Sequence, residues 1–240
     1  VQPYGEDPRR ALFAVYDGHG EHGQEVSQFA MEYIRDNLHK HPSFSTDLPA
    51  ALKTTFLACD LAMKKDPTVR CKHSGTTAVV AVLVDKTLTL ASAGDSRAVL
   101  ATKKGSKIIA KDLTVDHNPD VPEEQARIEA AGGRVYVYGG ARGPVDSRVG
   151  LPRLKADCSI QMKRQKVTGE IVDLPFLNMS RALGDCWSRH PLTGIRLVSP
   201  EPDITRHTLA RTDRFLLLYS DGVSGVLSDD EACRFVADEL

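Results

Sequence analysis

Apolar residues recur every three to four positions over residues 24–39 and again over 48–65. This spacing places them on one face of a helix, so each segment is predicted to be an amphipathic helix whose apolar face meets a core. A shorter helix is predicted at 122–131, where two glycines would end it. A last helix begins after Ser228, because Glu231 three residues later completes a capping box.

Runs of apolar and β-branched residues predict strands in the rest of the chain. Four of them follow one another, at 77–84, 87–93, 98–102 and 107–111. Short turn sequences join them, so we predict one antiparallel meander. Two further apolar runs, at 11–16 and 215–220, each stop at an Asp-Gly pair. Helices and antiparallel strands in this order predict an α+β layered fold.

Both Asp-Gly pairs lie at the end of a strand, where catalytic and ligand-binding residues are often placed. Glycine lets the backbone approach a ligand closely, so Asp17 and the Gly18 carbonyl could face one hard cation. His19 would then lie beside that cation as a proton donor. The second pair begins at Asp221, and two such strand ends from distant parts of the chain predict one shared metal site. Either pair alone could equally be an ordinary turn.

Composition and charge narrow the class of protein. The 240 residues suit one domain, and a formal net charge of −1 provides no overall attraction for nucleic acid or an anionic membrane. The five cysteines are scattered and form no C-x-x-C pair, which argues against a disulfide framework or a structural zinc site. No signal peptide opens the chain, and no apolar run approaches the ~20 residues of a membrane span. We therefore expect a soluble, intracellular monomer that binds neither nucleic acid nor membrane.

Eight short motifs follow one another along the chain. They are FAVYDGHG at 13–20, SGTTA at 74–78, GDSR at 94–97, Asp116-His117, EAAGG at 129–133, SRALGD at 180–185, SPEPD at 199–203 and Ser220-Asp221-Gly222. With this ordered series the chain resembles the metal-dependent type 2C serine/threonine protein phosphatases along nearly its whole length. One motif would be a weak signal, whereas eight in order are specific. The resemblance implies a four-layer α-β-β-α fold, in which helices flank a central β-sandwich of antiparallel sheets.

The resemblance also implies an activity and a site. Members of that family hydrolyse phosphoserine and phosphothreonine in proteins with a metal-activated water, so the expected partners are phosphorylated proteins and the expected cofactors are two Mg²⁺ or Mn²⁺ ions. Asp17 matches a carboxylate that bridges the two ions, and the Gly18 carbonyl and Asp221 match further ligands. Asp116 matches a carboxylate at a third, weaker metal site, although it could instead cap the helix that follows. His19 would protonate the departing oxygen.

A basic segment, residues 141–175, distinguishes the chain from shorter members of that family. Between positions 141 and 168 it holds seven Lys and Arg residues against two Asp residues. The simpler interpretation is a solvated surface loop. The functional interpretation is selection of acidic or multiply phosphorylated substrates, because each phosphate carries about −1.5 to −2 charges. The candidate substrate-binding residues are Arg142, Arg148, Arg153 and Lys155. The segment is similar to that of a nuclear branch of the family, so a cytoplasmic or nuclear location is expected.

Two arginines in the motifs, Arg97 and Arg181, could bind phosphate. We instead predict that they form buried ion pairs with Asp95 or Asp185, because the family pattern places both motifs in the scaffold.

Departures from the family pattern leave two alternatives open. Gly225 stands where a second acidic residue is expected, and carboxylate-bearing strands expected at both ends of the domain are not found within 1–240. The chain would then be a single phosphatase-like domain without its terminal strands. The first alternative function is therefore a catalytically weak, phosphatase-like binding module. The second is a cysteine-dependent phosphatase, because Cys158 and Arg164 have C-x₅-R spacing. The bulky residues between them suit a phosphate-binding loop poorly.

Overall fold

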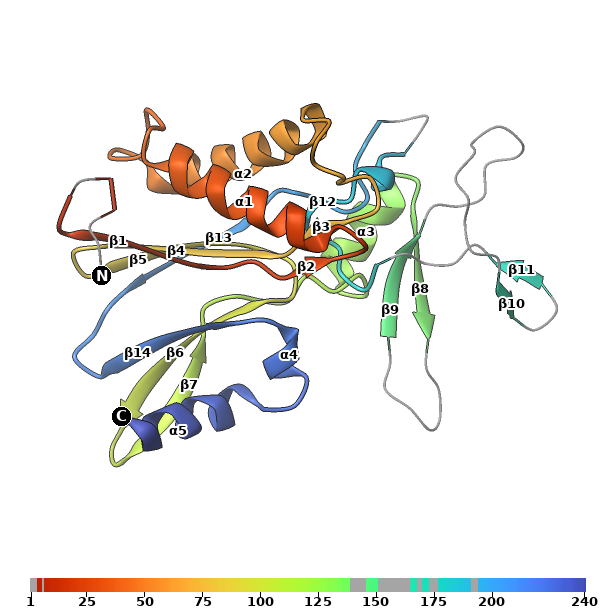
Figure 1. The fold of residues 1–240 in the computed structure, drawn as a ribbon. Helices are drawn as coiled ribbons and strands as arrows, with labels where there is room; N and C mark the ends of the chain where they lie inside the picture. The colour runs from red at the N-terminus through yellow and green to blue at the C-terminus, as the bar shows by residue number, and fades with distance from the viewer. Residues whose placement is uncertain are drawn as a thin grey trace.

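The computed structural model describes residues 4–5, 7–138, 146–150, 165–167, 170–172, 177–190 and 194–240. Two antiparallel sheets lie at its centre (Figure 1). The first has the strand order β1 (Arg10–Val15), β4 (Ala78–Val84), β5 (Thr87–Ala93) and β13 (Asp203–Thr208). The second has the order β14 (Asp213–Tyr219), β6 (Arg97–Lys104) and β7 (Lys107–Asp112).

Helices cover the outer face of each sheet (Figure 1). The first sheet carries α1 (Gly23–Leu38) and α2 (Leu48–Lys65), whereas α5 (Asp229–Glu239) packs on the second. The fully buried Val26, Ala30, Ile34 and Leu38 recur every four residues along α1 and form one core cluster with strand residues such as Val80. The predicted α-β-β-α layering is therefore confirmed.

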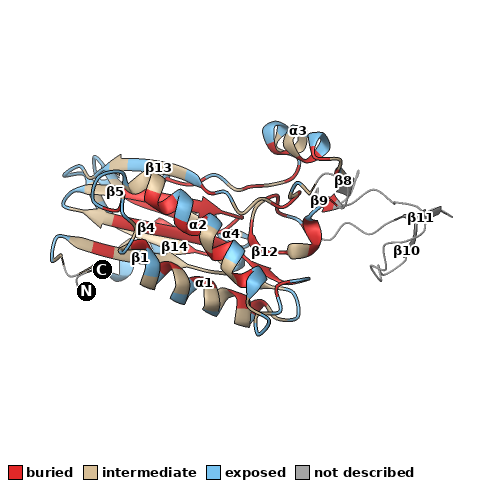
Figure 2. Cartoon of the chain, turned by 90° about the horizontal axis from the view of Figure 1, so that it is seen from above, coloured by how far each residue is buried: buried red, intermediate tan, exposed pale blue. Residues whose placement is uncertain are grey.

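Strand residues alternate between the two sides of each sheet, as a period of two requires. In β4, Val79 and Ala81 point into the space between the sheets, whereas Val80 and Val82 point to α1 and α2. In β6, Leu100 lies between the sheets and its neighbour Val99 packs toward α5. Figure 2 shows the resulting band of buried residues along the central strands. These strands are apolar on both faces because both faces are covered.

The strands predicted to form one meander are divided between the two sheets. The hairpins β4–β5 and β6–β7 are present, but β5 pairs with β13 and β6 pairs with β14. The chain crosses from one sheet to the other at Gly94, which has φ of 112°. This conformation favours glycine, and an added Cβ would collide with Thr77. The prediction of a single meander was wrong, because the apolar pattern of a strand does not specify which sheet it joins.

The helix predictions agree with the structure. The bounds of α2 are those predicted, and α1 and α3 (Pro122–Ala130) differ by one residue at their ends. Ser228 and Glu231 form the predicted capping box at the start of α5. No helix in the described part of the chain is both long and apolar enough to cross a membrane.

Besides β13 and the strands of the hairpins described below, four short elements were not predicted. They are β2 (Gly18–His19), β3 (Gly75–Thr76) and β12 (Leu183–Gly184), which form a small sheet, and the short helix α4 (Asp221–Ser224). A single turn of 3₁₀ helix, η1 (Cys186–Ser188), follows β12. These elements are too short for hydrophobic periodicity to reveal them.

Part of the basic segment 141–175 forms hairpins instead of one unstructured loop. Strand β9 (Asp146–Gly150) pairs with β8 (Arg134–Tyr138), and β10 (Gln165–Val167) pairs with β11 (Glu170–Val172). The first hairpin packs on α3, because Val149 and Val135 join a core cluster with Ile128. The loop interpretation was therefore wrong for these described residues. Arg148 is exposed on β9, whereas the other three candidate substrate-binding residues, Arg142, Arg153 and Lys155, lie outside the described residues.

Candidate active site

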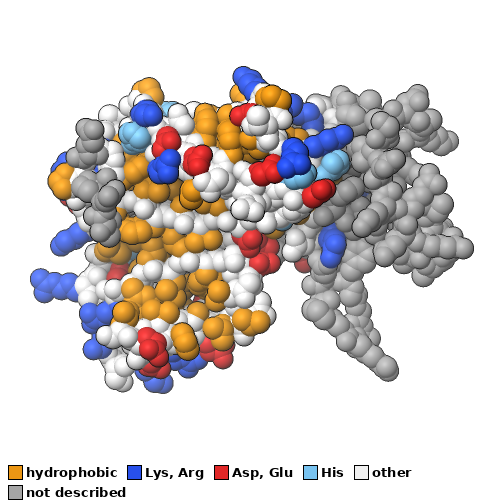
Figure 3. Space-filling view, in the orientation of Figure 1, with side chains coloured by type: hydrophobic (Ala, Val, Ile, Leu, Met, Phe, Trp, Pro, Cys, Tyr) orange, Lys and Arg blue, Asp and Glu red, His pale blue; other side chains and the backbone are white. Residues whose placement is uncertain are grey.

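The two Asp-Gly pairs predicted from the sequence come together at one end of the sandwich. Asp17 follows β1, and Asp221 begins α4 directly after β14. Burial and the neighbouring charge of Asp221 raise the pKa of Asp17, so the two carboxylates are close enough to repel one another. Figure 3 shows an acidic patch in this region, between β2 and α4. The Gly18 backbone is exposed beside Asp17.

A third carboxylate, Asp95, belongs to the same cluster. It is buried in the crossing between the two sheets, and its pKa is raised to about 6 by burial and by the charges of Asp221, Asp116 and Asp17. Sequence analysis placed Asp95 only as a possible partner of Arg97. The sequence signal that could have identified Asp95 is its position in a turn that begins with glycine and joins two buried strands.

Thr77 connects the segments that carry Asp17 and Asp95. Its Oγ1 accepts a hydrogen bond from the Asp17 backbone N at 3.0 Å and lies 2.7 Å from Ser96 Oγ. The Thr77 backbone N in turn donates to the Asp17 carbonyl at 2.9 Å. Thr77 is buried, so these contacts are protected from water. The SGTTA and GDSR motifs therefore act together to place the two aspartates.

His19 lies at the edge of the acidic cluster and is paired with Asp185. Its Nε2 is 2.6 Å from Asp185 Oδ2, and the other carboxylate oxygen accepts a hydrogen bond from Trp187 Nε1 at 3.1 Å. Burial alone would lower the pKa of His19, but the hydrogen bond to Asp185 and nearby aspartate charges outweigh it and raise the pKa. Nδ1 of His19 is buried without a hydrogen-bond partner among the described residues. The protonated ring therefore has one buried N–H for which the described residues supply no acceptor.

Gly75 makes the close contact between His19 and Asp185 possible. A Cβ at this position would lie 2.6 Å from His19 Nε2 and would clash with Asp185 Oδ2. We expect Gly75→Ala to lower the free energy of unfolding by about 1–3 kcal/mol, because the crowded backbone cannot move freely. Thermal unfolding measures the loss. Gly222→Ala is the matched control, since its Cβ meets Ser220 Oγ at an ordinary 3.6 Å. Equal stability of the two variants would contradict this geometry.

Asp116 is bound to an arginine. Its two carboxylate oxygens accept hydrogen bonds from Arg97 Nε and Nη2 at 3.0 and 2.8 Å. It does not cap α3, which starts after Val121 without a side-chain cap. In this arrangement both oxygens face a guanidinium, so a cation at Asp116 would compete with Arg97.

Arg97 and Arg181 form ion pairs as predicted, but with other partners. Besides Asp116, Arg97 binds Asp229 at the start of α5. Arg181 binds Glu124 of α3 at 2.7 Å and Asp203 at 2.6 Å. Of the predicted partners, Asp95 belongs to the acidic cluster instead, and Asp185 pairs with His19. Both arginines have a structural role, since each connects elements that are distant in sequence.

The carboxylates suit a hard divalent cation in their chemistry, but they are few. Mg²⁺ and Mn²⁺ prefer oxygen ligands, and a cation would offset the repulsion between Asp17 and Asp221. Within the described ranges, however, no three His, Cys, Asp or Glu side chains lie close enough to form a metal centre by themselves. Gly225, at the end of α4, supplies no carboxylate. The described residues therefore fit a hard divalent cation in chemistry, but they would give it few protein ligands.

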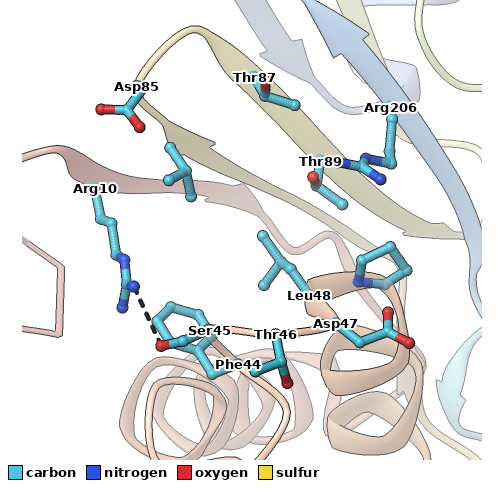
Figure 4. A pocket seen from close by; sticks show the side chains of 12 residues that line it. Arg10, Phe44, Ser45, Thr46, Asp47, Leu48, Asp85, Thr87, Thr89 and Arg206 are labelled. Carbon is cyan, nitrogen blue, oxygen red and sulfur yellow. Dashed lines mark hydrogen bonds between the residues drawn. The ribbon is translucent and has the colours of Figure 1, made fainter.

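A cavity of 310 Å³ lies at the opposite end of β1 from Asp17. It opens between the residues that precede α2 and the strand ends of the first sheet, and Arg10, Asp85 and Arg206 line it (Figure 4). Arg10 Nη2 donates to Ser45 Oγ across it at 3.2 Å. The cavity contains none of the predicted site residues.

Comparison with known proteins identifies the family of this chain. The family model described as Protein phosphatase 2C matches residues 2–240. Protein phosphatase 2C homolog 2 of Aspergillus fumigatus is 34% identical over 98% of this chain and 47% of its own length. Probable protein phosphatase 2C 12 of Oryza sativa is 40% identical over 78% of this chain and 42% of its own length. The chain thus spans about half the length of these curated relatives or less.

Solved structures have the same fold. A serine-threonine phosphatase 2C from Toxoplasma gondii superposes with a TM-score of 0.74 at 24% identity, covering 97% of this chain and 74% of that one. A sex-determining protein of C. elegans gives a TM-score of 0.71 at 28% identity, covering 98% and 48%. The family match along nearly the whole chain, and relatives above 30% identity, establish the assignment. The chain belongs to the protein phosphatase 2C family.

Proposed function

We propose that the protein hydrolyses phosphoserine and phosphothreonine in other proteins by attack of a water molecule activated by two divalent cations. The observation that carries this proposal is the convergence of Asp17 and Asp221 from two sheets, with the pKa of Asp17 raised by burial and by its neighbour. When bound, Mg²⁺ or Mn²⁺ supplies a water of lowered pKa for attack on phosphorus. Asp17, the Gly18 carbonyl and Asp221 would hold the ions.

Two further aspartates have different roles in this proposal. Asp95 adds negative charge beside the metal ligands, and its raised pKa would fall when a cation binds. Asp116 would assist a third, weaker ion only if Arg97 released it, because its oxygens are occupied.

His19 would donate the proton that the departing serine or threonine oxygen needs. The Asp185 carboxylate favours the protonated ring and orients it through Nε2. Nδ1–H, which is buried in the free protein, would be the donor once substrate binding brings the departing oxygen against it. An alkoxide is a poor leaving group, so this proton contributes to the rate. Arg148, with Arg142, Arg153 and Lys155, would favour acidic or multiply phosphorylated substrates through positive charge.

Metal removal tests the function. We expect a chelator to abolish release of phosphate from a phosphothreonine peptide and added Mn²⁺ to restore it, because the attacking water depends on the metal. Cys158→Ser should leave turnover nearly unchanged. Chelator-resistant turnover that needs Cys158 would favour the cysteine-dependent alternative instead.

The second candidate function is a catalytically weak phosphatase-like binding module. Gly225 and the low number of metal ligands in the described residues favour it. A phosphopeptide that binds without being hydrolysed at saturating Mn²⁺ would support this candidate over the enzyme.

A further inference from the structure

Two cysteines far apart in sequence lie in contact near the His19–Asp185 pair. Cys71 is in the segment between α2 and β3, and Cys186 begins η1, yet their Sγ atoms are 3.1 Å apart. The backbones are also joined, since the Cys186 N donates to the Cys71 carbonyl at 3.0 Å. The next residue continues the pairing, because the Trp187 N donates to the Lys72 carbonyl at 3.0 Å. This pairing holds the two thiols together without a covalent bond.

The surroundings of the pair make one thiol more acidic than the other. Cys71 accepts a hydrogen bond from the Cys186 thiol, and this bond outweighs burial and lowers the pKa of Cys71 to about 7. The same bond and burial raise the pKa of Cys186. Arg196, which is ion-paired to Asp60 at 2.8 Å, favours a thiolate on either cysteine. The lower pKa favours a thiolate on Cys71, whereas the half-buried Cys186 is the more accessible of the two sulfurs.

The other described cysteines provide a contrast. Burial raises the pKa of Cys59 well above that of a free thiol, and it raises the pKa of Cys233 to about 11. Both are fully buried in core clusters, Cys59 on α2 and Cys233 on α5, so the feature that distinguishes Cys71, which is also buried, is its contact with the Cys186 sulfur. Thiols of this kind react slowly with oxidants.

We propose that Cys71 and Cys186 form a reversible intramolecular disulfide when the protein meets a hydroperoxide. One thiolate of the pair attacks one peroxide oxygen, the O–O bond breaks, and the other oxygen takes up a proton and leaves as water, or as an alcohol when the oxidant is an organic hydroperoxide. The sulfenic acid formed is attacked by the other sulfur of the pair, whose proton leaves with the hydroxyl group as water. Two thiols lose two electrons in total and one peroxide gains them. A dithiol reductant reverses the reaction by exchange.

The disulfide would also act on the proposed reaction, and this second step rests on the proposed function. Forming the bond shortens the distance between the sulfurs from 3.1 Å to about 2.05 Å, so one or both segments must move. Cys186 directly follows Asp185, which orients His19. A displacement of about 1 Å in a positioning group can reduce a rate up to about 10²-fold. We expect oxidation to lower turnover reversibly, by roughly tenfold.

Mass spectrometry of the whole chain tests the disulfide without reference to activity. After treatment with hydrogen peroxide and digestion without reductant, we expect a peptide pair joined through Cys71 and Cys186. Cys71→Ser and Cys186→Ser should each remove it, whereas Cys59→Ser and Cys233→Ser should leave it. Peroxide-treated protein in which both thiols still react with an alkylating reagent would overturn the proposal. A bond to Cys158 or between two chains would also overturn it.

Thermal unfolding of the protein without substitutions is a second, independent test of the disulfide. The disulfide closes a loop of more than 100 residues, so we expect the oxidised protein to unfold about 5–10 °C higher than the reduced protein. Dithiothreitol should reverse the shift, and the Cys71→Ser variant should not show it. Turnover is measured on the same samples. A disulfide that forms without changing turnover would remove only the link to His19, whereas absence of turnover in the reduced protein would count against the proposed function alone.

Discussion

Replacing His19 with alanine is expected to slow hydrolysis of phosphoserine by roughly 10²–10⁴-fold, because the departing alkoxide then lacks a proton donor. An aryl phosphate such as p-nitrophenyl phosphate should be affected much less, since its leaving group departs without a proton. Steady-state rates on the two substrates measure the difference. The matched control is His22→Ala, which removes a nearby histidine that lies beside Glu21 and Glu25 instead of Asp185. Equal losses on both substrates would assign His19 to metal binding or to structure.

The pH dependence follows from the raised pKa of His19. The donor must be protonated, so turnover should fall as the pH rises through the pKa of the folded protein, which lies above the ordinary ~6.5. Asp185→Asn removes the favourable charge and should move this fall to lower pH. The raised pKa of His19 also stabilises the folded state. This contribution to the free energy of unfolding is fully present below the unfolded-state pKa of ~6.5, and it is lost as the pH rises through the folded-state pKa. A pH–rate profile unchanged by Asp185→Asn would contradict the pairing.

The 240-residue chain is expected to bind Mn²⁺ weakly, with a dissociation constant on the order of 10⁻⁴–10⁻³ M, and to show little turnover even at saturating metal, so the rates of the variants above are compared at saturating Mn²⁺. Affinity in oxygen sites follows the number and rigidity of charged ligands, and Asp17 and Asp221 are the only two predicted carboxylate ligands not bound to an arginine. Isothermal titration calorimetry measures the affinity and the number of ions. Tight binding of two ions would show that further ligands contribute.

Adding a carboxylate at Gly225 is a direct test of this deficit. Gly225 has φ of −71°, which any residue adopts, although a Cβ would lie 2.9 Å from the Asp221 carbonyl oxygen, so the backbone of α4 must shift in any variant at this position. We expect Gly225→Asp to tighten Mn²⁺ binding by roughly tenfold or more, because one more negative charge faces the divalent ion. Gly225→Asn introduces the same shape without the charge and is the control. If both variants bind Mn²⁺ alike, position 225 does not face the metal.

Local elements were predictable because their signals are local. The apolar period of four along 24–39 predicted α1, and the capping box at Ser228 predicted the start of α5. The strand ends at Asp17 and Asp221 were predicted from apolar runs that stop at glycine. In each case the residues that specify the element lie within a few positions of one another.

The sequence by itself determined the four longer helices, the main strands β1, β4, β5, β6, β7 and β14, the family and the two strand-end aspartates of the candidate site. Only the tertiary structure decided the sheet to which each strand belongs, because a strand that is apolar on both faces can pack in either sheet of a sandwich. It also decided that Arg97 binds Asp116, that Asp185 binds His19 and that Cys71 meets Cys186. Charge pairs and thiol contacts depend on distance through space, and folding brings together side chains that the sequence separates by as many as 166 positions.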